Sequence, residues 1–147
     1  MTEPFTIRRY QPSDRESCRS LWRALTEWHR RIYRDPFIGG EHPEDYFDEH
    51  LAKVRPDRLW VAVHDSRVVG LVGLILNGEE AEIEPLIVSE AYRHQGIGKK
   101  LIGAVVSEAE NLEIRFLNVK PVARNVQAIK FLHGQDFKTL GHMELFM

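Results

Sequence analysis

The sequence predicts one α/β (α+β) domain over residues 1–147, with a mixed, mostly antiparallel central sheet of roughly six to seven strands flanked by about four helices. Three observations predict this class. Short runs rich in β-branched residues indicate strands, and apolar residues at helical spacing indicate amphipathic helices. No repeat, low-complexity tract or Gly/Ser linker divides the 147 residues, so we expect a single domain.

The N-terminal third predicts one strand followed by two helices. Residues 5–11 alternate apolar and polar side chains, as a half-buried strand does. "SDRE" then has the pattern of a capping box, with Ser13 as the N-cap and Glu16 three residues later. The helix that follows should end before "DPFIGG", and a second helix should start at Pro43 and stop near Pro56.

The remaining chain predicts six further strands or helices before its closing strands. "LWVAVH" and "VVGLVGLIL" read as a hairpin, and "NGEE" turns into a strand from Ala81 to Val88. An amphipathic helix from Ile97 to about Ala109 comes next, then a strand in "EIRFLNV" and a short helix in "NVQAIKFLH". "DFKTLGHMELFM" is expected to form a closing pair of strands.

Composition excludes several functional classes. The formal net charge of -2 disfavours a dedicated nucleic-acid-binding protein. No segment is apolar enough to span a bilayer, and the N-terminus lacks a signal-like apolar region. The single cysteine, Cys18, cannot form an internal disulfide, so a reducing cytoplasm is expected. The seven histidines lack zinc-ligand spacing, and no metal is expected.

The turn "RHQGIG" opens directly into the helix that begins near Ile97. A helix N-terminus has unpaired N–H groups and attracts anions, and glycine lets a phosphate approach them closely. Gly96 and Gly98 would permit this approach and positive φ, while Arg93, Lys99 and Lys100 add positive charge. The spacing is neither that of a P-loop nor of a dinucleotide fingerprint, and a merely flexible turn is the alternative.

"YRHQGIGKKLI" resembles the pyrophosphate-binding motif of the GNAT superfamily, the acyl-CoA-dependent N-acetyltransferases. "EIEPLIV" is similar to the fourth strand of that family, and "NVQAIKFLHGQDF" to its later helix and following Phe. The resemblance covers almost the whole chain. It implies a sheet splayed at strands four and five, and transfer of an acetyl group from acetyl-CoA directly to a primary amine of a small molecule or peptide.

The resemblance also implies how acetyl-CoA is held. Pantetheine would lie in the splay, where Pro85 cannot donate a ladder hydrogen bond. Asn125 would contact pantetheine, although Asn is also a preferred N-cap. The implied cofactor-binding residues are Leu86, Ile87, Val88, Arg93, His94, Gln95, Gly96, Ile97, Gly98, Lys99, Asn125 and Phe131.

The amine must lose a proton to react, so a base is needed. Strand alternation predicts that Glu82, Glu84, Leu86 and Val88 share one face. The resemblance implies a glutamate base here. We expect Glu84, which would be nearer the thioester, with Glu82 in reserve; the Leu86 N–H would polarise the carbonyl. Alternatively, both glutamates are solvated, or one pairs with an arginine.

Two positions depart from the family pattern. Leu132 replaces the usual tyrosine acid, and Asp136 replaces the glycine before the closing Phe. Tyr33, Tyr92, His94 or water remain open as the proton donor. These departures motivate an alternative function, a non-catalytic acyl-CoA-binding or regulatory module. The acidic residues of 41–49 could attract a cationic amine or favour a helix dipole, and the closing strands could pair across a homodimer.

Overall fold

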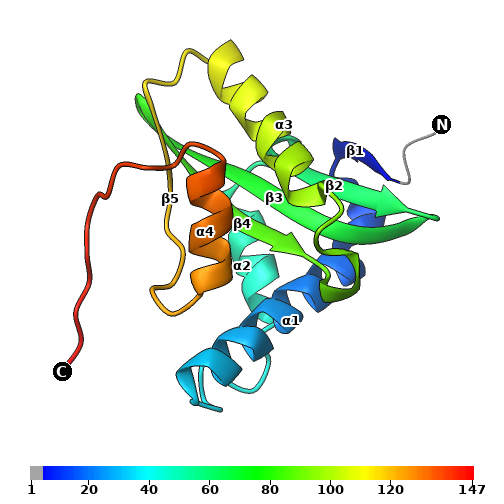
Figure 1. Cartoon of the computed structure of the whole chain (residues 1–147). Helices are drawn as coiled ribbons and strands as arrows, with labels where there is room; N and C mark the ends of the chain where they lie inside the picture. Colours follow the sequence, from blue (N-terminus) through cyan, green and yellow to red (C-terminus); the bar gives the residue numbers. More distant parts are fainter. Residues whose placement is uncertain (1–4) are drawn as a thin grey trace.

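The computed structural model describes residues 5–147, which form a mixed α/β fold (Figure 1). Its sheet has five strands in the order β1-β2-β3-β4-β5. The first three pairings are antiparallel, whereas β4 and β5 are parallel. The strands are β1 Thr6–Arg9, β2 Leu59–His64, β3 Arg67–Asn77, β4 Glu80–Val88 and β5 Phe116–Val119.

Helices cover both faces of this sheet, as Figure 1 shows. On one face, α1 and α2 bury Leu21 and Phe47 against the sheet. On the other face, α3 and α4 bury Leu101 and Leu132. Each helix therefore buries one apolar stripe, as its spacing predicts. The helices are α1 Arg15–Tyr33, α2 Asp45–Lys53, α3 Ile97–Asn111 and α4 Val126–Gly134, with short 3-10 turns at Pro12–Asp14, Pro56–Arg58 and Glu90–Tyr92.

The start of α1 differs from the predicted capping box. A 3-10 turn at Pro12–Asp14 precedes α1, so Asp14 rather than Ser13 is the residue in front of the helix. The Asp14 carboxylate is buried, accepts a hydrogen bond from the Gln11 N–H at 2.8 Å, and pairs with Arg8 at 2.7 Å. The ion pair with Arg8 stabilises Asp14 in front of the helix. The neutral Ser13 hydroxyl could bind this arginine only weakly.

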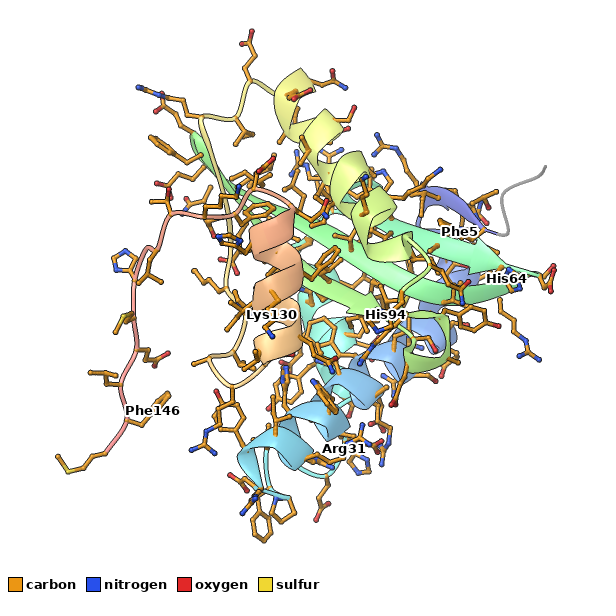
Figure 2. The ribbon with its side chains drawn as sticks, in the orientation of Figure 1. Phe5, Arg31, His64, His94, Lys130 and Phe146 are labelled. Carbon is orange, nitrogen blue, oxygen red and sulfur yellow. The ribbon has the colours of Figure 1, made fainter. Side chains whose placement is uncertain are left out.

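The prediction of closing strands is wrong, and the sheet has five strands instead of six to seven. No strand follows α4, and the side chains of Leu140 and Phe146 are 78% and 87% exposed. Figure 2 shows Phe146 on a terminal segment that extends away from the sheet. A strand is stable only when its backbone groups pair with a neighbour, and within residues 5–147 this segment has none. The predicted fold class is otherwise confirmed.

The predicted splay between β4 and β5 is present. Their pairing runs from Glu80↔Phe116 to Ile83↔Val119 and goes no further, so from Glu84 onward β4 faces no strand on that side. On its other side, β4 shifts register against β3 near Gly73. A Cβ on Gly73 would lie 2.5 Å from the Glu84 carbonyl oxygen, so only glycine admits this close approach.

The register shift changes which β4 side chains share a face. Ile83 packs in the core beside α3, but Ile87 packs beside α1 and α2. Leu86 and Val88 pack against the α3 side, the face of Ile83, which is opposite to that of Glu82. The prediction that Glu82, Glu84, Leu86 and Val88 share one face is therefore wrong, because a bulge moves subsequent side chains to the other face.

Candidate active site

The turn between β4 and α3 presents a cluster of free backbone donors. His94 and Gly96 have φ of 64° and 84°, and α3 begins at Ile97 without a side-chain cap. Lys100 is the first residue to donate a helical bond, to the Gly96 carbonyl at 3.1 Å. Within the described chain, no N–H group from His94 to Lys99 has an acceptor. Such a turn followed by a helix N-terminus can bind phosphate oxygens. Figure 2 shows His94 beside the end of β4.

Gly98 does not adopt the positive φ that the sequence allows for it. It lies within the first turn of α3. A Cβ at this position would lie 2.9 Å from the Phe131 Cζ atom of α4. Gly98 thus lets Phe131 pack against the start of α3, whereas Gly96, like His94, supplies a left-handed residue of the turn. Of the two neighbours, Ile97 is buried and Lys99 is exposed.

Arg93 is anchored where β4 leads into the turn. Its Nε donates to the Val88 carbonyl at 3.4 Å, and its guanidinium lies 5.7 Å from the centroid of the Trp28 ring. Arg31 lies over the same ring at 5.1 Å. The two cations line a cavity of about 460 Å³ between α1 and the end of β4. This arrangement keeps positive charge beside the donors of the turn.

Glu82 and Glu84 form a pair of carboxyl groups at the point where β5 leaves β4. Partial burial raises the pKa of Glu84, and the hydrogen bond and negative charge of Glu82 raise it further; Lys120 and Lys53 oppose this rise. The Lys120 ammonium lies 2.9 Å from the Glu82 Oε1 atom. A carboxylate with a raised pKa is a stronger base, which suits a group that accepts a proton from an amine.

Three more polar side chains join this pair from outside β4, and sequence reasoning missed them. Burial lowers the pKa of His50 in α2, and a hydrogen bond to the Glu84 backbone acts against that shift. The His50 Nε2 and Asn118 Oδ1 atoms are buried without a partner among residues 5–147. Asn118 is the β5 neighbour of Glu82, and Lys120 follows two residues later. Only the register of β4 with β5 could have identified these two, and no local pattern specifies it.

The sequence matches the family model described as the Acetyltransferase (GNAT) family over residues 22–137, well over half of the chain. The chain belongs to the GNAT family. It is also 42% identical over 79 residues to an uncharacterised N-acetyltransferase of Bacillus methanolicus; the match covers 53% of this chain and 62% of that relative.

Solved GNAT structures share the fold. A GNAT acetyltransferase of Staphylococcus aureus superposes with a TM-score of 0.78 and 18% identity, covering 96% of this chain and 89% of its own. The PaiA N-acetyltransferase of Thermoplasma acidophilum, solved with coenzyme A, gives 0.75 and 18% over 92% and 89%. At 18% sequence identity, the similarity to these structures shows the fold alone. The roles of individual residues are inferred from the geometry of the site.

The positions that depart from the GNAT pattern have structural explanations. Leu132 is 5% exposed in the core beside α3, so a tyrosine hydroxyl there would need a buried partner. Asp136 occupies the left-handed region with φ of 73°, as the replaced glycine could. Asn125 caps α4, since its Oδ1 accepts from the Ala128 N–H at 3.3 Å. The Tyr33 hydroxyl accepts from the Arg124 N–H at 3.4 Å, beside this cap.

The acidic residues of 41–49 chiefly fasten α2 to α1. Asp45 pairs with Arg19 at 2.9 Å, Asp48 pairs with Arg15 at 2.8 Å, and Glu44 pairs with Arg23 at 2.7 Å. Because arginines of α1 neutralise these carboxylates, they offer a cationic amine less attraction than their number alone suggests.

Cys18 is a free thiol packed in the core. It is 0% exposed, and burial raises its pKa to about 12. We expect native protein at pH 8 to react with a disulfide reagent such as Ellman's reagent at least about 100-fold more slowly than protein in denaturant, because thiolate is the reactive form. Absorbance at 412 nm measures the reaction. A rapid native burst would contradict this expectation.

Among residues 5–147, no group of three or more His, Cys, Asp or Glu side chains could hold a metal ion. No helix in that range is long and apolar enough to cross a membrane.

Proposed function

We propose that this protein is a cytoplasmic N-acetyltransferase that transfers the acetyl group of acetyl-CoA to a primary amine of a small molecule or peptide, directly within a ternary complex. One observation carries the proposal. The unpaired edge of β4, from Glu84 to Val88, connects the free N–H groups of the turn at one end with the glutamate pair at the other. Diphosphate, pantetheine and thioester occur in that order along acetyl-CoA.

The geometry supports a division of roles among the bound parts. The N–H groups from His94 to Lys99 hold the diphosphate, and the exposed Lys99 adds charge. Pantetheine lies along the free β4 edge and bonds its backbone groups, as an added strand does. The side chains of Asn125 and Phe131, which lie at the start of α4 and against Gly98, contact the cofactor from the opposite side.

The reaction needs one base and one oxyanion donor. Glu84 takes a proton from the acceptor amine, whose nitrogen then forms a bond to the acetyl carbon. The Leu86 N–H stabilises the oxyanion. The carbon–sulfur bond breaks, and coenzyme A leaves as a thiolate. The nitrogen, which still carries one proton more than the amide product, loses that proton through water to the thiolate. Glu84 finally releases its own proton to solvent, so charge and protons balance.

Thiol release with a panel of amines tests this function. The panel includes monoamines, diamines, amino-acid amides and short peptides, with acetyl-CoA held constant, and mass spectrometry identifies an acetylated product. Turnover well above acetyl-CoA hydrolysis supports the proposal. Calorimetry on the same preparation measures coenzyme A binding, and an absence of binding would overturn it.

Leu132 and Asp136 favour a second candidate, a module that binds acyl-CoA without catalysing transfer. Leu132 is buried and cannot donate a proton to the leaving thiolate. This candidate predicts coenzyme A binding without turnover on every amine of the panel. The raised pKa of Glu84 argues against it, since a carboxyl group held beside a second one has a cost that a binding module need not bear.

A further inference from the structure

The glutamate pair raises a question that the proposed function leaves open, namely which carboxyl group takes the proton. Two carboxyl groups in hydrogen-bond contact share their titration, and identical surroundings would leave the proton on either. The surroundings of Glu82 and Glu84 are not identical. Lys120 forms an ion pair with Glu82 at 2.9 Å, and no ion pair to Glu84 is found among residues 5–147.

We propose that Lys120 is a positioning residue that engages Glu82 in an ion pair and thereby leaves Glu84 as the carboxyl group that takes the proton from the acceptor amine. The inference rests on the proposed transferase reaction. The register of β4 with β5 brings Glu82 and Lys120, which directly follows β5, together at the splay.

Contacts on each side of Glu84 support this assignment. From its own strand, Glu82 contributes a hydrogen bond and a negative charge. From α2, Lys53 contributes a positive charge, and His50 bonds to the Glu84 backbone while its buried ring keeps a lowered pKa and so favours the neutral form. From the end of β5, Lys120 acts on Glu84 through space, but it touches Glu82. On the other side of β4, β3 places Gly73 against the Glu84 backbone.

Lys120 can be changed with little risk to the fold. Its side chain is 70% exposed, whereas that of Glu82 is 22% exposed, so the lysine lies on the solvent side of the glutamate pair. The interaction with Glu82 also raises the pKa of Lys120 itself, so the ammonium stays charged throughout the range in which an amine acetyltransferase works.

Removal of the Lys120 charge should make Glu84 harder to ionise. Glu84 must be ionised to act, so kcat/KM rises with pH as Glu84 loses its proton. A cation favours the ionised form, and without it this rise occurs at higher pH. We expect Lys120→Met to lose roughly three- to tenfold of kcat/KM on the acidic side of the profile and to match the wild type at its alkaline plateau. Lys120→Arg keeps the charge and should follow the wild-type profile.

Two further variants separate an ion pair from a general electrostatic field. Lys53→Met removes a cation that does not touch Glu82, and should move the profile less than Lys120→Met. Glu82→Gln removes the neighbouring negative charge and should move the rise to lower pH. An unchanged profile in Lys120→Met, an Arg variant that behaves like Met, or an equal effect of Lys53→Met would overturn the assignment.

A measurement without turnover keeps this test independent of the proposed function. Glutamate labelled with ¹³C at the carboxyl carbon gives one resonance per residue, and the Glu82→Gln and Glu84→Gln variants assign the two signals. In Lys120→Met, the Glu84 signal should titrate at higher pH than in the wild type. If it does so in a protein that acetylates no amine, the transferase proposal fails and the Lys120 assignment stands. If it does not move, the assignment fails whatever the activity.

Discussion

Replacement of Glu84 by glutamine should lower kcat/KM for the best acceptor amine by about 10²- to 10⁴-fold, the usual contribution of a general base. Glutamine is nearly isosteric with glutamate but cannot take a proton from the amine. Glu84 is partly exposed and lies where β5 has left β4, outside the buried core, so the change should leave the core intact. Steady-state thiol release measures the loss, and calorimetry should give an unchanged Kd for coenzyme A.

The matched control for Glu84→Gln is Glu110→Gln, which removes an exposed carboxylate near the far end of α3. This variant should keep wild-type kcat/KM. The pH dependence of the defect also tests the role of Glu84 as a base. At high pH the free amine predominates and needs the base less, so the loss of kcat/KM in Glu84→Gln should be smaller there. Full activity of Glu84→Gln across the pH range would remove Glu84 from the mechanism, and Glu82 would then be tested in the same way.

Replacement of Gly96 by valine should weaken coenzyme A binding by about 10- to 100-fold. A β-branched residue at φ of 84° is strained by roughly 1–3 kcal/mol, so the turn is expected to change conformation and point its N–H groups elsewhere. No atom outside the neighbouring residues lies within 4 Å of a Cβ at Gly96, so backbone conformation and not a clash would cause the effect. Isothermal calorimetry with coenzyme A measures the Kd.

Gly78→Val provides a control of the same kind at a remote site. Gly78 has φ of 65° and equally open surroundings, but it lies in the turn between β3 and β4. The two variants should lose similar amounts of thermal stability, yet only Gly96→Val should bind coenzyme A more weakly. Equal Kd values in both variants would show that the turn at Gly96 does not hold the diphosphate. A loss in both would point to general destabilisation.

The sequence alone was enough to predict most of the fold, because most of the elements are specified by local patterns. The β2–β3 hairpin has β-branched runs around a short turn, and α3 has an apolar stripe that begins directly after a glycine turn. The turn with free N–H groups before α3 was predicted for the same reason: its free donors follow from where a helix starts, and Gly96 is local in sequence. Family membership also followed from these contiguous motifs.

The tertiary structure decided what depends on pairing between distant segments. The closing strands did not form, since an apolar pattern cannot supply the neighbouring strand that a ladder needs. The faces of Leu86 and Val88 were reversed by the bulge opposite Gly73, because a single extra residue inverts the alternation beyond it. The register of β4 with β5 and the packing of α2 brought Lys120 and His50 to the glutamates. Charge at the candidate base therefore depends on contacts between residues far apart in the chain, which no local pattern encodes.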